Sequence, residues 1–450
     1  MEFLNNYPYV IDIIKGEYGF DKKFENKNYF ASLEQQIQQF VETQKITKPL
    51  INRRNGIIKH LNKIFTNKFQ NSKLYSFGSF ESGLSLSFGD IDLCLEFDDG
   101  APKKVLKKIA RMLNEDGMKD VKLITNARVP IVKCIDAKSM IPIDISVNNN
   151  LSVYNTELLR RYSKLDPRVK PFILAVKYWA KNRGICDPTF GTFSSYAWTL
   201  IAISALQTMT NPVIPNLTTK DGRQKVTING KSFDVSMLDG NSIDFVSTNT
   251  DSVSELMYGF FAQLALNWPW NKSVISVGSG KLLPRKQKNW EHQKPFISDS
   301  IQDKKIQRLG KYPLPVEDPF DELHDLSLTL DAEGVLEIRD EVLRAHASIH
   351  ALAEWSTICE IKYPERAQDT PQLDLFEDLR GRDEAEIKIE LQGLYSSLDI
   401  VEKSVSVRES ERNDAIRMSK ALRKNAELAR EKSILSSELR PRRSKINEIQ

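Results

Sequence analysis

The chain contains 450 residues, of which 40% are apolar and 28% are charged, and its formal net charge is +4. A chain of this length is expected to form two or three domains with a large core. It contains no run of about 18 apolar residues, so the sequence predicts no membrane span. The small positive charge permits a polyanionic partner but does not require one.

Targeting and redox signals predict an intracellular protein. The first twenty residues carry acidic side chains and lack a basic stretch followed by an apolar core, so neither a signal peptide nor a transit peptide is predicted. The cysteines are scattered without CxxC spacing or neighbouring histidines, which favours reduced, buried thiols over zinc ligands: Cys94, Cys134, Cys186 and Cys359. We expect a cytoplasmic location, and the basic stretch RPRRSK (440–445) leaves a nuclear one open.

An α/β unit is predicted in the first third of the chain. Amphipathic helices come first, between Phe30 and about Phe69, where apolar residues recur three and four apart. A strand, LYSFGS, leads to a helix from about Glu81, and a basic helix is predicted over 102–118. We interpret the polar face of that basic helix as solvated, with RNA contact as the alternative. The strand-like segments VKLITN, ARVPIVKCIDA and MIPIDISVNN then end near Asn150.

Helices dominate from residue 150 onward. They are predicted over 154–166, 167–184, 194–209, 251–268 and about 340–357, interrupted by a Pro-rich connector (211–217), a polar stretch (218–250) and a turn at Pro319. From about Asp369 the chain is charged and nearly free of aromatic residues, and its apolar residues alternate four and three apart: Ile387, Leu391, Leu394, Leu398, Val401 and Val405. This tail is interpreted either as a solvated, fraying helix or as a coiled coil that binds a protein partner.

Two strand-like segments carry carboxylates opposite an apolar face: GDIDLCLEF (89–97), which follows the Gly-Ser stretch, and IPIDISV (141–147). In GDIDLCLEF the side chains of Asp90 and Asp92 share one face, and in IPIDISV Asp144 points away from the isoleucines. If the two strands are neighbours, the three carboxylates converge. Two carboxylates about 4 Å apart repel by about 4 kcal/mol at an effective dielectric of 20, so a cation is expected between them. Oxygen ligands without His or Cys favour Mg²⁺ or Mn²⁺, and a two-ion site can activate a hydroxyl and stabilise a leaving oxygen.

A Gly-Ser turn precedes these aspartates. Gly78 and Ser79 end a strand where a helix begins, so free backbone N–H groups and the serine hydroxyl are expected to hold the phosphates of a nucleotide. A Gly-Ser turn or an Asp-x-Asp pair alone is a weak signal. Their combination, with a third aspartate on a similar strand, predicts a catalytic site rather than a solvated strand.

The stretch FGSFESGLSLSFGDIDLCLEF resembles the signature of the DNA polymerase β-like nucleotidyltransferases, Gly-Ser followed by Asp-x-Asp. Within that superfamily the chain resembles the noncanonical poly(A) polymerases and terminal uridylyltransferases, over about residues 60–350 and most strongly over 77–207. This resemblance implies an α/β (α+β) fold in which a mixed-sheet catalytic domain faces a mainly helical domain, with the nucleotide in the cleft between them. The implied domains are N-terminal helices that pack on the helical domain (1–55), the nucleotidyltransferase domain (56–150), the helical central domain (151–365) and a charged helical, coiled-coil or partly disordered tail (366–450).

The resemblance also implies roles for individual residues. Asp90 and Asp92 bind both metal ions, and Asp144 completes the site beside the RNA 3′ hydroxyl, which displaces pyrophosphate from a nucleoside triphosphate. The matching nucleotide contacts are Lys177 and Lys181 for the triphosphate, Ser195 for phosphate, Tyr196 for base stacking, and Asn149, Asn155 and Thr156 for ribose and base. Their structural alternatives are a basic helix face, core packing, and capping or turn formation. Arg128 and Lys133 flank the third-aspartate region and are candidates for RNA contact.

His324 is the residue most informative about the nucleotide. It stands six residues after Asp318 in VEDPFDELHDL, where uridylyltransferases of the family resembled carry a histidine and the adenylating members usually do not. Imidazole there can bond a uracil carbonyl and fill the space that a purine needs, while Asp318 and Asp321 match positions that bond the base edge. The alternative is a capping or exposed histidine. The chain departs from the family pattern at Asp325, where Asn is usual, and at Gly89, where Ser is usual.

Three hypotheses follow from the sequence. The first is a Mg²⁺-dependent terminal uridylyltransferase that uses UTP and RNA 3′ ends. The second is an adenylating member of the same family that uses ATP, and the third is an inactive RNA-binding scaffold. The natural RNA is not predicted.

Overall fold

The computed structural model describes residues 24–363 except for positions 88, 98–100, 126, 229, 240–242, 244, 268–271, 292–295, 300–304 and 309–311. Two compact units are distinguished: the larger comprises Asn26–His346 and Glu354–Leu373, and the smaller comprises Met1–Glu25, Ala347–Ala353 and Asp374–Gln450. The catalytic candidates all lie in the larger unit. Within the described ranges, no helix has both the length and the apolar character needed to cross a membrane. The predicted apolar seam of the tail and the basic stretch at 440–445 lie outside the described residues.

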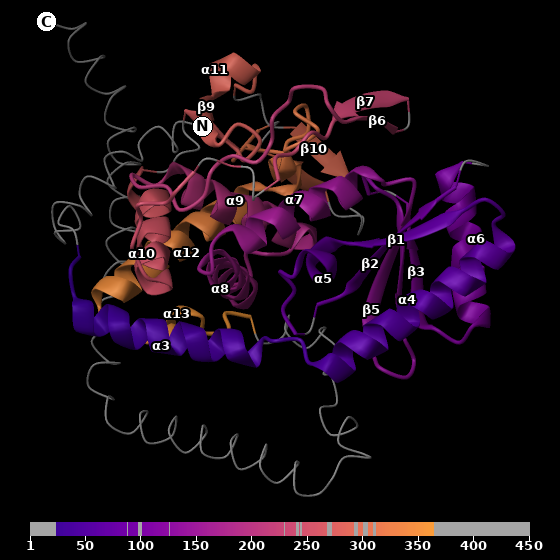
Figure 1. Ribbon diagram of the computed structural model, residues 1–450, viewed down its shortest axis with the longest axis horizontal. Coiled ribbons are helices and arrows are strands. Elements are labelled where there is room, and N and C mark those ends of the chain that lie inside the picture. The colour runs from indigo at the N-terminus through magenta and orange to yellow at the C-terminus, as the bar shows by residue number, and fades with distance from the viewer. Residues whose placement is uncertain are drawn as a thin grey trace, which may run out of the picture. The chain divides into compact units, whose positions relative to one another are not determined.

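A five-stranded mixed sheet forms the predicted catalytic domain (Figure 1). Its strands, in spatial order, are β1 (Lys73–Phe77), β2 (Ile91–Glu96), β5 (Pro142–Val147), β4 (Ile131–Ile135) and β3 (Lys119–Ile124). β2 and β5 run parallel, and the other neighbours are antiparallel. The predicted mixed sheet is therefore confirmed.

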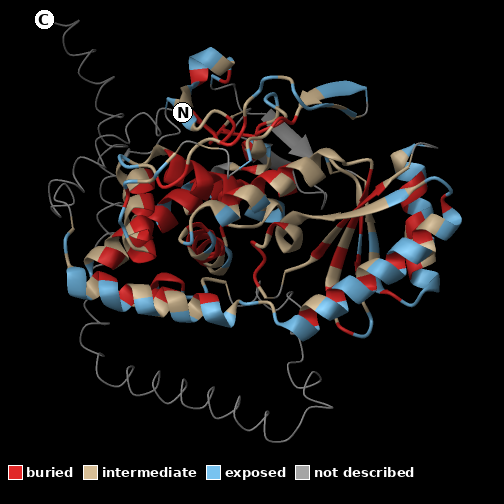
Figure 2. Ribbon diagram, viewed as in Figure 1, coloured by how far each residue is buried: buried red, intermediate tan, exposed pale blue. Residues whose placement is uncertain are grey.

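Two helices, α4 (Lys48–Lys68) and α6 (Pro102–Glu115), bury their apolar sides with one face of this sheet. Figure 2 shows both helices with mixed buried and exposed positions, as amphipathic helices require. The shared core includes Leu50, Ile57, Leu61, Phe65, Val105, Leu106, Ile109, Leu113, Ile91, Leu93, Ile143 and Ile145. The domain boundary placed after residue 55 falls inside α4, and Leu50 already belongs to the core of the sheet.

The remainder of the larger unit is mainly helical. Its principal helices are α7 (Leu151–Leu165), α8 (Val169–Asn182), α9 (Ser195–Thr208), α10 (Val253–Ala262) and α12 (Ala332–His350). α9 is buried throughout from Ala197 to Gln207, because its sequence is apolar on every side. The N-terminal helix α3 (Lys27–Thr43) contacts α8 and α10, and Ser254 donates its hydroxyl to the Phe30 carbonyl (2.9 Å).

Short elements connect these helices. They are α5 (Gly78–Ser82), η1 (Pro188–Phe190), β6 (Lys225–Ile228), β7 (Lys231–Asp234), η3 (Gln263–Asn267), β8 (Ser273–Ser276), β9 (Lys281–Pro284), α11 (Arg285–Lys288), β10 (Phe296–Asp299), β11 (Lys305–Arg308), β12 (Val316–Glu317), η5 (Leu326–Thr329) and α13 (Trp355–Ile358). The helix predicted over about 340–357 is wrong at both ends. α12 begins eighteen residues before its C-terminal His350, where Asp331 accepts the N–H of Gly334, and the chain turns at Leu352, whose φ is +58°.

Candidate active site

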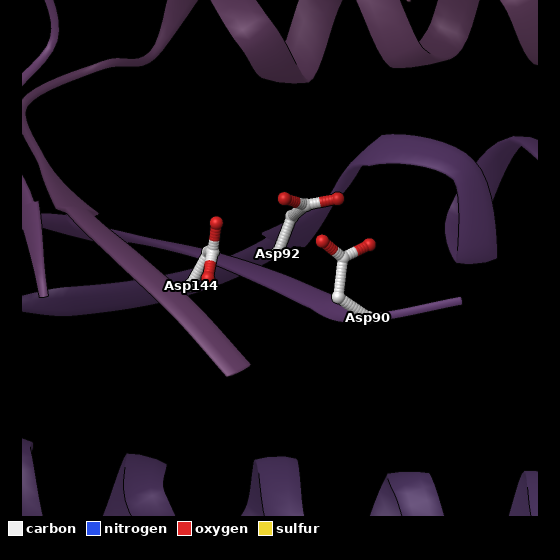
Figure 3. A group of neighbouring side chains, drawn as sticks. All are labelled: Asp90, Asp92 and Asp144. Carbon is white, nitrogen blue, oxygen red and sulfur yellow. The ribbon is translucent and has the colours of Figure 1, made fainter. Parts of the chain in front are cut away.

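Three carboxylates meet on the side of the sheet opposite the apolar core (Figure 3). Because β2 and β5 are parallel neighbours, Asp92 lies directly opposite Asp144 in the register, and Asp90 stands one residue before β2. Each of the three residues offers an oxygen, and these oxygens lie within 4.8 Å of one another. The convergence predicted from the period of two along each strand is confirmed.

The three negative charges of this cluster repel one another. Burial raises the pKa of Asp92 well above its usual value, and the neighbouring Asp90 and Asp144 carboxylates raise it further. Burial also raises the pKa of Asp144, against the opposing effect of Lys133. Hard oxygen donors that repel one another at this spacing suit a divalent cation, and the set contains no softer His or Cys donor. The residues present therefore fit the predicted metal site.

Lys133 is the counter-charge of the cluster within the sheet. It lies opposite Asp144 in the β4–β5 register, and its Nζ is 2.6 Å from Asp144 Oδ2. Burial alone would lower the pKa of Lys133, but the carboxylates of Asp144, Asp90 and Asp92 raise it. Its predicted RNA contact stays a prediction, since in this structure the ammonium group bonds Asp144.

The Gly-Ser turn lies against the second aspartate. Gly78 has φ +80°, and a Cβ added there would lie 2.0 Å from Asp92 Oδ2. The N–H of Gly78 donates to Thr156 Oγ1 (2.8 Å), and Thr156 in turn donates to the Ser152 carbonyl (2.7 Å). The Gly78 N–H is therefore not the free phosphate donor expected from the sequence, and Thr156 on α7 holds the turn in place.

The two predicted triphosphate lysines differ in burial. Lys177 is buried on α8 and donates its Nζ to the carbonyl of Leu84 (2.6 Å), in the loop that leads to Asp90. Lys181, one helical turn later, is exposed, and Ser195 is exposed in the first turn of α9. Burial lowers the pKa of Lys177, and the Asp90 and Asp92 carboxylates oppose this effect. Lys177 therefore ties α8 to the loop that leads to Asp90, whereas the Lys181 side chain is exposed.

A buried carboxylate organises the predicted base-contacting loop. Asp318 Oδ1 accepts the backbone N–H groups of Phe320 and Asp321 (3.0 and 3.1 Å). Its Oδ2 accepts the side-chain amide of Asn155 (3.1 Å) and the hydroxyl of Tyr196 (3.2 Å). Asp318 thus joins the loop to α7 and α9 through Asn155 and Tyr196, and the nucleotide contacts of these two residues stay predictions.

His324 lies next to this carboxylate. Its Nδ1 is 4.0 Å from Asp318 Oδ2, and its backbone N–H donates to the Asp321 carbonyl (2.7 Å). Burial lowers the pKa of His324 to about 4, and the positive charge of Arg128 lowers it further. Arg128 comes from the loop before β4 and bonds the Asp321 carboxylate at 2.8 Å. The imidazole is therefore neutral at physiological pH.

The two departures from the expected pattern have local structural roles. Asp325 is buried, and its Oδ1 accepts the backbone N–H groups of Val316 and Ser327 (3.1 and 2.9 Å). A Cβ at Gly89 would lie 2.2 Å from the hydroxyl oxygen of Ser85. Asp325 thus stabilises the fold of the loop, and Gly89 permits a close approach. Asn149 likewise has a local contact, because its side chain donates to Ser152 Oγ at 2.6 Å.

Comparisons with known proteins agree with this geometry. Residues 33–164 match the family described as "Poly(A) RNA polymerase, mitochondrial-like, central palm domain", and residues 252–324 match "Cid1 family poly A polymerase". The chain is 34% identical over 282 residues to the terminal uridylyltransferase cid1 of Schizosaccharomyces pombe. The aligned region covers 61% of this chain and 68% of cid1. The chain belongs to the noncanonical poly(A) polymerase and terminal uridylyltransferase family.

The similar proteins include poly(A) RNA polymerases as well as a terminal uridylyltransferase. The poly(A) RNA polymerase cid11 of Schizosaccharomyces pombe is 28% identical over 317 residues, which make up 69% of this chain and 61% of cid11. The chain therefore spans less than two thirds of cid11. A solved structure of Cid1, described for its RNA terminal uridylyl transferase activity, superimposes with a TM-score of 0.64 at 29% identity, over 74% of this chain and 98% of that one. The Cid1 likeness confirms the predicted nucleotidyltransferase fold.

Arg54, which contacts the loop before Asp90, was not predicted from the sequence as a residue of the site. Arg54 is completely buried on α4 and contacts the backbone at Gly89 and Asp90. A signal was present, because Arg54 stands among Leu50, Ile57 and Leu61 at helical spacing, on the apolar side of the helix. A charged residue on that side needs a partner, which in this case is the backbone of the loop that carries Asp90.

Proposed function

We propose that this protein is a template-independent RNA nucleotidyltransferase that adds UMP from UTP to RNA 3′ ends. The observation that carries the transfer reaction is the cluster of Asp90, Asp92 and Asp144 beside the Gly78 turn. Similarity to both a uridylyltransferase and poly(A) polymerases supports the reaction class, and the neutral His324 beside Asp318 favours UTP. An adenylating enzyme that uses ATP is the alternative.

The proposed reaction forms a bond between the RNA 3′ oxygen and the α-phosphorus of the nucleotide and breaks the bond to pyrophosphate. Asp90, Asp92 and Asp144 would hold two Mg²⁺ ions. Bound there, such ions activate the 3′ hydroxyl and stabilise the leaving pyrophosphate. The exposed Lys181 and Ser195 supply a cation and a hydroxyl for the triphosphate.

Selection of uracil is proposed to rest on the loop around Asp318. Asp318 fixes the Asn155 amide and the Tyr196 hydroxyl, and the Oδ1 of Asn155 is buried without a partner among the described residues. A neutral His324 can donate an N–H to a uracil carbonyl, and its ring occupies space that a purine would need. Work on the UTP selectivity of Cid1 includes a histidine-to-asparagine variant of that protein bound to MgATP, which supports testing His324 as the selector here.

The decisive test is a comparison of UTP and ATP on a labelled oligoribonucleotide. Wild-type protein is expected to extend the RNA faster with UTP, and the double variant Asp90→Ala/Asp92→Ala is expected to add neither nucleotide. We expect His324→Asn to shift the UTP/ATP rate ratio toward ATP by about 10-fold, since it removes bulk and changes one base contact. Faster extension by the wild type with ATP would replace the uridylyl proposal with the adenylyl alternative. No extension with any nucleotide would favour the inactive scaffold.

The pH dependence of this preference gives a separate prediction. An unperturbed histidine, with a pKa of about 6.5, is roughly three quarters protonated at pH 6. Because burial lowers the pKa of His324 to about 4, it stays neutral from pH 6 to 8. The UTP/ATP rate ratio, measured at equal metal concentration, is therefore expected to stay constant over that range. A ratio that falls as the pH drops through 6.5 would contradict this role of His324.

A further inference from the structure

The loop that leads to the first catalytic aspartate is held by side chains from three different helical regions. Gln44, directly after α3, accepts the backbone N–H of Ser87 (3.3 Å) and its hydroxyl (3.1 Å). Lys177 on α8 donates to the carbonyl of Leu84. Arg54 on α4 holds the last part of the loop, next to the metal-binding carboxylates.

Arg54 makes two kinds of contact there. Its guanidinium donates from one terminal nitrogen to the Asp90 carbonyl at 3.2 Å and from the other to the Gly89 carbonyl. The guanidinium carbon also lies 5.0 Å from the ring centroid of Phe80, a cation–π contact with the short helix α5 that begins at Gly78. A single planar group therefore links the backbone of the first catalytic aspartate to the Gly-Ser helix.

Burying the Arg54 guanidinium costs folding free energy. Arg54 is 0% exposed, and its Nε has no hydrogen-bond partner among the described residues. An apolar side chain would extend the stripe of Leu50, Ile57 and Leu61 without the cost of burying a cation. The Gly89 and Asp90 carbonyls and the nearby Asp90 and Asp92 carboxylates offset part of that cost. An arginine at position 54 therefore holds the geometry of the Gly89–Asp90 loop at a cost to the stability of the core.

We propose that Arg54 is a positioning residue for nucleotide transfer: it fixes the Gly89–Asp90 backbone so that the Asp90 carboxylate is aimed at the metal-binding cluster. The inference rests on the proposed function, because it assumes that Asp90, Asp92 and Asp144 bind divalent metal. Arg54 does not touch the reacting atoms in this role and acts only through the backbone of Asp90.

Charge and position predict opposite effects when Arg54 is removed. A guanidinium near carboxylates repels an incoming cation, so electrostatics alone would make metal binding tighter in a variant without the charge. Loss of positioning would instead make metal binding weaker, as is common when a group supporting a metal ligand is removed. The sign of the change in metal affinity therefore separates the two effects.

The test measures Mn²⁺ binding by electron paramagnetic resonance, together with transfer kinetics, in four variants of the full chain. Arg54→Met removes the fork and keeps the apolar stem, and Arg54→Lys keeps the charge but cannot bridge two carbonyls in the same way. Arg53→Met is the matched control, because Arg53 is the exposed neighbour on the same helix. Asp90→Ala/Asp92→Ala identifies the signal that belongs to the carboxylate cluster.

Arg54→Met is expected to weaken Mn²⁺ binding and lower kcat by about 10-fold or more, with KM for the nucleotide nearly unchanged. Arg54→Lys should lie between Arg54→Met and wild type, and Arg53→Met should match wild type. Unchanged or tighter Mn²⁺ binding in Arg54→Met would overturn the positioning role. If circular dichroism shows that Arg54→Met does not fold, Arg54→Lys decides by the same criterion. If the wild type binds no Mn²⁺, or if Asp90→Ala/Asp92→Ala binds it equally well, the proposed function itself would be overturned. This comparison is made before any Arg54 variant is examined.

Discussion

Asp92→Asn is expected to abolish nucleotide transfer while making the metal-free protein more stable. Asp92 supplies one of three carboxylates whose oxygens lie within 4.8 Å, and burial followed by repulsion from Asp90 and Asp144 raises its pKa well above normal. A raised pKa means that the native state is destabilised at every pH above the ordinary carboxyl pKa, because the same carboxyl ionises more readily in the unfolded chain. At neutral pH the asparagine variant escapes this cost, which is about 3 kcal/mol per carboxylate pair at an effective dielectric of 20. The same change removes a metal ligand, so we expect transfer to fall by at least about 1000-fold.

Thermal unfolding at pH 7.5, with and without Mg²⁺, measures both the stability of the metal-free protein and the stabilisation by bound metal. Without metal, the Tm of Asp92→Asn is expected to exceed that of wild type by roughly 1–4 °C. Added Mg²⁺ should raise the Tm of wild type and leave the variant nearly unchanged. Asp116→Asn is the matched control, because Asp116 pairs with His60 outside the cluster. A variant that is less stable than wild type and still responds to Mg²⁺ would contradict the assignment of Asp92 as a metal ligand.

The aspartate cluster could be predicted because it depends on local periodicity and one tertiary assumption. The period of two along a strand places Asp92 and Asp144 opposite their apolar neighbours, whatever the rest of the fold does. Only the adjacency of the two strands had to be assumed, and the parallel β2–β5 pairing supplies it. The burial of α9 also has a local cause, since a helix that is apolar on every side has no face for water.

The contacts that hold the site together could not be predicted in this way. The Gly78–Thr156 bond and the Lys177–Leu84 bond connect residues far apart in sequence, so no spacing rule indicates them. The resemblance implies nucleotide contacts for Thr156 and Lys177, whereas in the structure each side chain already has a backbone partner. The hairpin of β6 and β7 was missed for another reason, because its polar alternation within 218–250 resembles a loop.

Gly78→Ala is the second large expected effect, with a loss of transfer of at least about 100-fold. The added methyl group would lie 2.0 Å from Asp92 Oδ2, well inside van der Waals contact, so either the turn or the carboxylate must move. Either movement separates Asp92 from Asp144 or breaks the bond from the Gly78 N–H to Thr156. A shift of about 1 Å in a reacting geometry is enough for a loss of this size.

Gly83→Ala separates this collision from simple backbone strain. Gly83 ends the same short helix with φ +74°, close to the +80° of Gly78, but a Cβ at Gly83 meets no atom within 4 Å. Both alanines carry the left-handed strain of roughly 1–2 kcal/mol, and only the one at position 78 meets the carboxylate. We therefore expect a loss of Tm in both variants, larger in Gly78→Ala because of the added collision, and a large loss of kcat only in Gly78→Ala. Equal losses of kcat would indicate that helix α5 as a whole, and not the approach of Gly78 to Asp92, limits transfer.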